Sequence, residues 1–413
     1  MLKHLAITMA FLATGTAALA QPATVDETLA DAARSNMFEI SRNADGSLSG
    51  PGWERLMAEA ENAQFFMIGE QHATADIAEI EAAIHLDLAE RGYEYMAAEI
   101  GPWSTRYAEQ LFRENEDIIA AIRSAPGSGY ALPFLSFAED AELHAQAVRL
   151  SPHTSEALWG VDQEFIAAMP VLLPMLEGLS RTEQQTAALA PLRELSVGNP
   201  MALGADAPDM FAALRTAFDT GEDGEALELV DAIILSNRIY APFTGRGGTG
   251  YSANLLRENY MKRNFLEHFT RAEQRDGEPP RVFLKFGANH VMRGRSLTNV
   301  PTLGDFIVEW ARVRNFEAVN IMIDCLGGNA VHVLSGAFAP CESYLAGDDP
   351  MIAGLAEGRA LTLIDLRALR PLIRSSTAID DATRTLIFAF DYYLGVADVS
   401  PATLIPEPML PPE

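Results

Sequence analysis

Three features are scarce or missing in this sequence, and each absence argues against a class of protein. The 413 residues include two cysteines that do not form a Cys-x-x-Cys pair, which argues against a cysteine-based zinc site. Lysine and arginine number 30 against 57 aspartates and glutamates, and the net charge of −27 opposes binding to nucleic acid or anionic membrane surfaces. No G-x-S-x-G nucleophile elbow is present, which argues against an ordinary serine hydrolase.

Long apolar runs are also lacking, except at the N-terminus. There Lys3 precedes an apolar stretch at 5–12, and a small-x-small cleavage site follows at Ala18-Leu19-Ala20. The stretch is short for a membrane span and no second one follows, so we expect a Sec signal cleaved after Ala20 and no stable membrane insertion afterwards. The mature protein is then secreted or periplasmic, and loss of Lys3 changes its net charge from −27 to −28.

The two cysteines, Cys325 and Cys341, form an even pair, and export would place them in an oxidising compartment. A disulfide between them is therefore expected. In the chain-entropy picture, a bond that closes a loop of this length stabilises the fold by roughly 3 kcal/mol. We expect this pair to be structural.

One stretch organises the rest of the chain: the apolar run 65–68, then Gly69, Glu70 and His72. A helical pattern of apolar residues follows over 75–91. We interpret this as strand, tight turn and helix, with the carboxylate and the imidazole at the carboxyl end of the strand. In open α/β sheets, ligands bind at that rim.

A second strand is expected at 95–100, and Glu99 lies near its end. Strand, helix and strand within about 35 residues is the spacing of a βαβ unit, whose two strands run parallel. Glu99 would then lie on the same rim as Glu70 and His72. Further strands are expected at 157–162, 281–286, 319–324, 360–365 and 390–396.

The predicted fold class is α/β, with a central, mostly parallel sheet flanked by helices. Residues 164–275 have helical patterns without a strand signal and are expected to form a large insertion that caps the carboxyl rim of the strands. Other helices are expected at 53–63, 104–123 and 137–150. The expected organisation is a signal peptide at 1–20, a turn-rich N-terminal segment at 21–50, a single domain at 51–405 and a Pro-rich tail at 406–413.

Within the insertion, residues 245–250 match the spacing G-x-G-x-x-G. The dinucleotide-binding motif needs a strand directly before it, whereas residues 229–240 have a helical pattern. We therefore expect a loop between helices at this position and no nucleotide site.

The strand expected at 281–286 delivers a second group of polar side chains to one loop. They are Lys285, Asn289, His290 and Arg293. His72 and His290 are the two histidines that follow both a strand and a glycine. They would share the rim with Glu70 and Glu99.

Two chemistries suit such a rim, and the spacing does not separate them. In the first, an imidazole removes a proton from water while a carboxylate fixes its tautomer, and Lys285 or Arg293 stabilises the developing oxyanion. In the second, two histidines and one or two carboxylates bind a divalent metal ion that activates water.

The motifs resemble those of the erythromycin esterase family. A helix with Arg257, Met261 and Asn264 looks like the helix that precedes the family's histidine strand, and Phe390-Asp391 looks like its last strand. The order of motifs is kept over about residues 60–405. The family looks related to the ChaN-like haem-binding lipoproteins and the TIKI/TraB proteins. The remaining matching motifs are Gly69-Glu70-Gln71-His72, Ala98-Glu99 and Lys285-Phe286-Gly287-Ala288-Asn289-His290.

The resemblance implies a mixed α/β sheet with a rim site built from Glu70, His72, Glu99 and His290. In esterase members such residues activate water to open a macrolactone. In TIKI-type members they bind a metal for peptide hydrolysis, and ChaN-like members are linked to haem. Only Gln71 separates the glutamate from the histidine in this chain, as in the ChaN-like Gly-Glu-x-His, whereas the esterases usually place two residues there.

We therefore expect an exported hydrolase that cleaves an ester, lactone or amide of a small-molecule substrate and requires no cofactor. Its catalytic set would be Glu70, His72, Glu99 and His290. The alternative is a periplasmic haem- or metal-binding protein without turnover, in which a metal would be held by the same four side chains. The residues expected to bind substrate are Lys285, Asn289, Arg293, Asp162 and Arg257.

Overall fold

The computed structural model describes residues 25–407, except 128, 220, 222–223, 333–334, 344–360, 376 and 378. The expected signal peptide at 1–20 lies outside the described residues, as does most of the expected Pro-rich tail. The predicted fold class is confirmed: the chain forms a mixed α/β structure around a nine-stranded sheet in the order β2-β1-β10-β11-β7-β3-β6-β4-β5.

The sheet is parallel from β11 through β5, and its other side is antiparallel, because β10 pairs antiparallel with both β11 and β1. A separate two-stranded hairpin joins β8 and β9. The strands are β1 Met37–Arg42, β2 Leu48–Ser49, β3 Ala63–Glu70, β4 Tyr95–Ala98, β5 Leu158–Gly160, β6 Val282–Gly287, β7 Glu317–Cys325, β8 Asn329–Val331, β9 Phe338–Pro340, β10 Leu361–Asp365 and β11 Tyr392–Val396.

All seven strands expected from the sequence are present, because each is a run of buried residues bounded by polar or glycine-containing turns. The N-terminal segment holds more structure than its turn-rich sequence indicates. It contains a helix, and β1 joins the sheet beside β10. Only Ile40 is fully buried in β1, so this strand lacks the continuous apolar run that marks the seven strands expected from the sequence.

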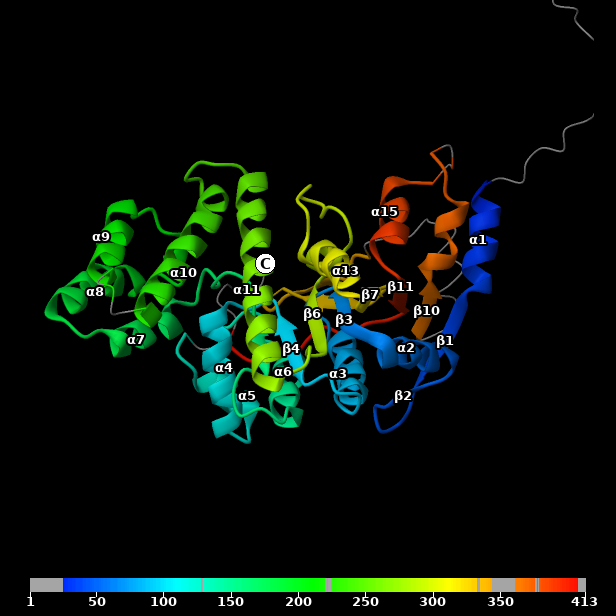
Figure 1. The fold of residues 1–413 in the computed structure, drawn as a ribbon, viewed down its shortest axis with the longest axis horizontal. Helices are drawn as coiled ribbons and strands as arrows, with labels where there is room; N and C mark the ends of the chain where they lie inside the picture. Colours follow the sequence, from blue (N-terminus) through cyan, green and yellow to red (C-terminus); the bar gives the residue numbers. More distant parts are fainter. Residues whose placement is uncertain are drawn as a thin grey trace, which may run out of the picture.

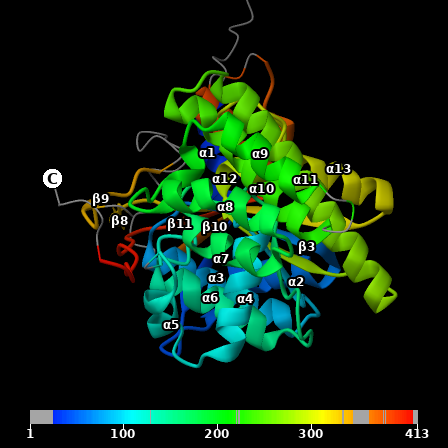
Figure 2. The same ribbon diagram turned by 90° about the vertical axis from the view of Figure 1, so that its left-hand side faces the viewer.

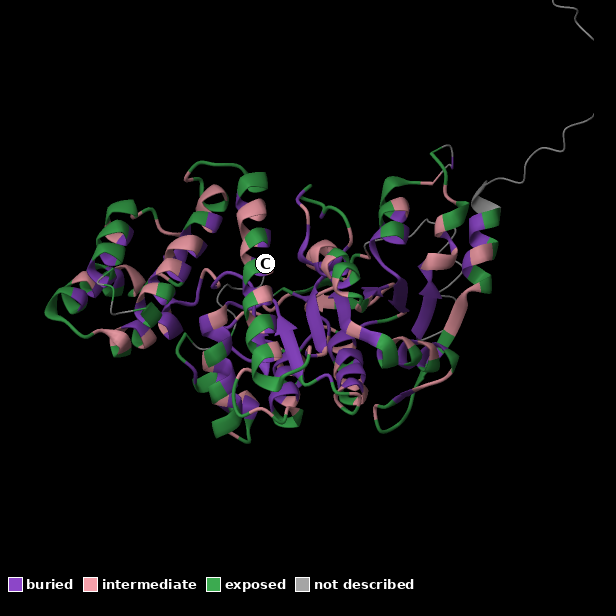
Figure 3. Ribbon diagram, in the orientation of Figure 1, coloured by how far each residue is buried: buried purple, intermediate pink, exposed green. Residues whose placement is uncertain are grey.

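Helices cover both faces of the sheet (Figure 1). In that view α3 and α6 lie below the strands and α13 and α15 above them. Figure 3 shows the central strands of the sheet as buried and most helices with one buried side, as expected for amphipathic helices packed on a sheet. The helices are α1 Val25–Ser35, α2 Pro51–Asn62, α3 Ala75–Ala89, α4 Pro102–Glu114, α5 Ile118–Ser124, α6 Ala138–Leu150, α7 Met169–Leu179, α8 Glu183–Ser196, α9 Pro208–Phe218, α10 Gly224–Tyr240, α11 Gly250–Asp276, α12 Ala288–Val291, α13 Leu303–Arg314 and α15 Asp381–Ala389, with 3-10 turns η1 Ala202–Gly204, η2 Ala241–Thr244, η3 Leu366–Ala368 and η4 Arg370–Leu372.

The helical insertion is present, but most of it lies beside the sheet. Helices α7 to α10 form an arm beyond β5 with an apolar core of its own, and Figure 2 shows this arm facing the viewer. The cap expected over the strand ends is therefore limited to α11, which returns to pack against β5 and α13. Residues 245–250 form the expected interhelical loop, because α10 and η2 precede them and α11 begins at Gly250.

The helix expected at 104–123 is in fact two helices. Helix α4 ends at Glu114, and Asp117 caps a new helix, α5, by accepting a hydrogen bond from the Ala120 amide. Aspartate is a favoured N-cap residue, because its carboxylate accepts a hydrogen bond from an amide in the first turn of the helix.

Candidate active site at the carboxyl rim of the sheet

The parallel pairing of β3, β6 and β4 brings the polar strand ends together. Glu70 is the last residue of β3 and lies opposite Gly287, the last residue of β6. Glu99 follows β4 directly, and the short helix α12 after β6 carries His290. The four residues expected to form the site therefore lie at one rim.

His72 makes a close pair with Glu70. Its Nδ1 lies 2.6 Å from Glu70 Oε1, so the ring donates this proton and its Nε2 is left as an acceptor. The His72 side chain is 33% exposed, whereas that of Glu70 is 4% exposed. Burial opposes a charge on the ring, but the carboxylate outweighs burial and raises the pKa of His72 above its ordinary value. An oriented imidazole with a free Nε2 is the arrangement of a general base.

Glu99 lies between the two imidazoles. Its Oε2 accepts a hydrogen bond from the Gly287 amide at 2.8 Å and lies 3.7 Å from His72 Nε2. Its Oε1 accepts from Arg257 Nη2 at 2.8 Å and lies 3.2 Å from His290 Nε2. Burial opposes ionisation, but His290 and Arg257 hold the pKa of Glu99 well below its usual value. Arg257 also pairs with Asp162. Both residues thus lie at the rim, and their expected role in substrate binding stays a prediction.

His290 meets two carboxylates and no neutral partner. Its Nδ1 lies 2.7 Å from Glu258 Oε1, and its Nε2 faces Glu99. Burial and the guanidinium of Arg257 oppose a charge on the ring, but the two carboxylates prevail and raise its pKa to about 9. His290 is therefore an imidazolium at neutral pH.

The backbone around His72 adopts conformations that non-glycine residues rarely take. Ala73 has a φ of 68° and Phe134 a φ of 62°. The Ala73 carbonyl accepts hydrogen bonds from the amides of Val331 and Ala402, which hold it in place, and the Phe134 ring lies over the His72 ring at 4.6 Å between centroids. Such strain clusters at functional sites, where the surroundings over-determine it.

Gly287 keeps the space beside His72 open. A Cβ at this position would lie 2.5 Å from His72 Nε2 and 3.4 Å from Glu99 Oε2. Only a glycine therefore lets β6 end this close to the imidazole.

Two residues expected to bind substrate lie elsewhere. Lys285 is 4% exposed and lies behind Glu70, on the face of the sheet covered by α3 and α6. Arg293 pairs through both of its terminal nitrogens with Asp391, which precedes β11. The side chain of Lys285 points to the helices α3 and α6, where it contacts Glu81 and Asp140. The side chain of Arg293 is held at Asp391, away from the rim residues. Asn289 lies beside His290, and its Oδ1 is buried without a partner among the described residues.

Sequence reasoning did not assign a role to Glu258, although it lies one residue after Arg257 on α11. Glu258 is 1% exposed. Glutamates are rarely buried without a partner, so its burial indicates a role in the site, but the sequence does not show that it is buried. The catalytic roles of the rim residues stay predictions.

Most of the rim nitrogens and oxygens contact one another, Arg257 or the Gly287 amide, and His72 Nε2 is the nitrogen without a hydrogen bond. Glu258 Oε2 is also buried without a partner among the described residues. A metal ion held by these side chains stays a prediction. Among the described residues, ligand atoms that converge within 4.8 Å belong to Glu70, Glu81 and Asp140. The ammonium of Lys285 already lies among these three carboxyl groups.

A cleft of about 1600 Å³ lies away from this rim. It lies between α4, α10 and α11, where Tyr260 and Arg263 line it. Arg257 and Glu258 contact the rim site from the same helix, so α11 separates the two regions.

No protein-family model matches the sequence, and no curated protein matches it at a significant level. Solved structures do match. One is the crystal structure of a protein from Bacillus cereus whose sequence is 13% identical to this chain. The match covers 92% of this chain and 99% of that protein, with a TM-score of 0.62. A histidine-to-asparagine mutant of the erythromycin esterase EreC in its open conformation is 13% identical, covers 90% and 100%, and also has a TM-score of 0.62.

The chain has the fold of these proteins. A succinoglycan biosynthesis protein shares it too, at 14% identity, 92% and 99% coverage and a TM-score of 0.60. The expected resemblance to the esterase family is thus confirmed at the level of the fold. ChaN of Campylobacter jejuni, solved with cofacial haem, has a TM-score of 0.32, which is too low to show a common fold. The relation to TIKI proteins stays a prediction.

Proposed function

We propose that this protein is an exported hydrolase that uses His72 to activate water against an ester, lactone or amide. The observation that carries the proposal is the unequal pairing of two neighbouring imidazoles. His72 is hydrogen-bonded to one carboxylate, and its Nε2 lies 3.7 Å from Glu99, beyond hydrogen-bond distance, whereas His290 lies within 3.2 Å of a carboxylate at each nitrogen. Environments that separate the pKa values of two titratable groups assign a base and an acid.

In the proposed reaction, His72 Nε2 takes a proton from water while Glu70 stabilises the imidazolium that forms. The oxygen of that water attacks the substrate carbonyl. The carbonyl carbon's bond to the leaving oxygen or nitrogen then breaks, and the imidazolium of His290 supplies the proton for that atom. Glu99 and Arg257 fix the positions of the two imidazole rings relative to each other. The proposed reaction requires no cofactor.

Export is part of the proposal and is supported by two features. The two cysteines form the expected disulfide, with Cα atoms 6.3 Å apart, as is common in oxidising compartments. In the described part of the chain, no helix has the length and apolarity needed to span a bilayer.

The test is hydrolysis of activated esters by the wild-type protein and His72→Gln. We expect the variant to lose about 10²–10⁴-fold in kcat, the usual contribution of a general base, without loss of fold. A matched control is His153→Gln, because His153 Nε2 also pairs with a glutamate, Glu94, at 2.9 Å but lies beside Tyr95 at the start of β4. Equal activity of wild type and His72→Gln would contradict the proposal, as would a chelator-sensitive activity.

A further inference from the structure

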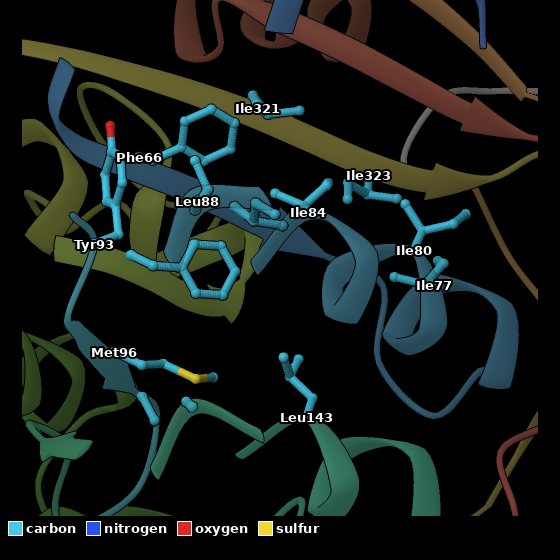
Figure 4. Packing of buried hydrophobic residues seen from close by; sticks show 14 of the residues in the cluster. Phe66, Ile77, Ile80, Ile84, Leu88, Tyr93, Met96, Leu143, Ile321 and Ile323 are labelled. Carbon is cyan, nitrogen blue, oxygen red and sulfur yellow. The ribbon is translucent and has the colours of Figure 1, made fainter. Parts of the chain in front are cut away.

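Behind the rim, a cluster of four ionisable side chains is sealed inside the protein. Lys285 on β6 contacts Glu70 on β3, Glu81 on α3 and Asp140 on α6. All four are at most 4% exposed. Figure 4 shows the apolar packing of this face, with Ile77, Ile80 and Ile84 of α3 and Leu143 of α6 between the helices and the strands. The cluster therefore has no direct access to water.

The three carboxyl groups do not contact the ammonium equally. Lys285 Nζ lies 2.5 Å from Glu70 Oε1 and 2.7 Å from Asp140 Oδ1, but 3.5 Å from Glu81 Oε2. Both carboxyl oxygens of Glu81 are buried without a hydrogen-bond partner among the described residues. Three carboxylates facing one ammonium would leave a double negative charge in an apolar interior, which is prohibitively costly.

The geometry therefore assigns the proton to Glu81. Burial and the neighbouring Glu70 carboxylate raise the pKa of Glu81 well above its usual value. Burial also opposes the charge on Glu70, yet Lys285 and His72 lower the pKa of that carboxyl to about 2. Glu70 is thus the carboxylate of the pair and Glu81 the carboxylic acid.

We propose that Lys285 is the resident cation of a three-carboxylate site of the kind that elsewhere takes a divalent metal, and that it positions Glu70 for His72. Asp140 is a positioning residue in this arrangement, since it touches no rim group except through Lys285, and Glu81 completes the site as a neutral acid without a positioning role. The catalytic meaning of this positioning rests on the proposed function, but the cation site does not.

The same oxygen, Glu70 Oε1, contacts both His72 Nδ1 and Lys285 Nζ. Asp140 Oδ1 also contacts the ammonium, at 2.7 Å, and so helps to fix the position of Lys285 Nζ beside Glu70. The other titratable groups near the cluster are two buried histidines, His144, whose Nδ1 donates to the Asp140 carbonyl, and His85 on α3. Burial lowers the pKa of both, so they add no charge at neutral pH.

The cation site is tested with Lys285→Ala and the melting temperature. We expect the variant to melt well below wild type, and millimolar ethylammonium or Mn²⁺ to restore at least half of the loss by filling the vacated position. Lys262→Ala is the matched control, because Lys262 donates to the Pro301 carbonyl at 2.7 Å and contacts no carboxylate within 4 Å among the described residues. If neither cation raises the melting temperature of Lys285→Ala more than that of wild type and Lys262→Ala, the cation site is overturned.

The positioning role is tested by proton NMR of the imidazole N–H that His72 donates to Glu70, identified by its absence in His72→Gln. Glu81→Gln, which mimics a neutral acid, should leave this resonance and kcat unchanged, whereas Asp140→Asn should shift the resonance and lower kcat several-fold at constant KM. Equal shifts in Glu81→Gln and Asp140→Asn, or none in either, would overturn the proposal even if Lys285→Ala did not fold. A protein that passes both tests but cleaves no ester would refute the proposed function alone.

Discussion

At the scale of single residues, the site depends on how closely the carboxylates approach each imidazole. His72 and His290 have the same chemistry in isolation, but His72 Nε2 lies 3.7 Å from Glu99 and makes no hydrogen bond, whereas both nitrogens of His290 lie within 3.2 Å of a carboxylate, which keeps that ring charged. Glu99 is shared between them and is fixed by the Gly287 amide. The distance from each ring's Nε2 to Glu99 therefore separates the proposed base from the proposed acid.

This difference predicts a bell-shaped pH dependence of kcat/KM. Activity should rise as pH increases through the raised pKa of His72, because only the neutral ring accepts a proton, and fall as His290 loses its proton near pH 9. Glu258→Gln removes a carboxylate that keeps His290 protonated, so the alkaline limb should move about 1 pH unit or more toward neutrality. Glu267→Gln, on the side of α11 that lines the large cleft, is the control. An alkaline limb that stays in place in Glu258→Gln would count against the assignment of His290.

At the scale of elements, the site depends on the close approach of α12 to β3. A Cβ on Gly69 would lie 2.8 Å from Val291 Cγ2 and 2.9 Å from Ala288 Cα. Both neighbours belong to α12, which carries His290. Gly69 lies within β3, so the glycine in the first motif makes room for the helix that carries the second histidine and does not form the turn expected from the sequence.

We predict that Gly69→Ala lowers both stability and activity. The added methyl group should push α12 outward, reducing the free energy of unfolding by about 1–3 kcal/mol, as overpacking does, and moving His290 away from Glu99. Urea unfolding and ester hydrolysis measure the two effects. Gly178→Ala in α7 is the control, because nothing lies within 4 Å of its added Cβ, and alanine in a helix should be neutral or stabilising by up to about 1 kcal/mol. A Gly69→Ala protein as stable and active as wild type would show that α12 is not held this tightly.

At the scale of the whole molecule, two histidines, His85 and His144, are buried as neutral rings, and a third, His268, is partly buried. Gln146 donates to His85, and His144 donates to a backbone carbonyl. His268 lies close to the Gly160 carbonyl of edge strand β5. Burial is the main cause that lowers their pKa values, to about 4 for His85 and about 3 for His144 and His268.

These histidines should contribute to the loss of folding stability at acidic pH. The unfolded chain protonates near pH 6.5 and the folded rings only near 3 to 4, so their contribution is present above pH 6.5 and is lost as pH falls toward 3. In His144→Gln, the slope of unfolding free energy against pH should decrease by about 1.4 kcal/mol per pH unit in this window. Urea unfolding at pH 8 and pH 5 measures it, and an unchanged difference between the two pH values would show that His144 is not buried as a neutral ring.

The sequence by itself determined the class of fold and the identity of the rim residues. Apolar runs that end in glycine and a carboxylate identified the parallel strands, and parallel strands place their carboxyl ends at one edge whatever the rest of the chain does. Glu70, His72, Glu99 and His290 followed from that rule alone. The weakly patterned strand β1 did not, because its burial depends on its neighbours and not on its own sequence.

Only the tertiary structure decided which side chains reach one another. Lys285 is two residues from the end of β6, but the pleat turns it toward α3 and α6, where it meets Asp140 and Glu81 instead of a substrate. Glu258 comes to His290 because a helix from the insertion crosses the rim. Pairing of this kind depends on contacts between segments far apart in the chain, and local patterns carry no information about them.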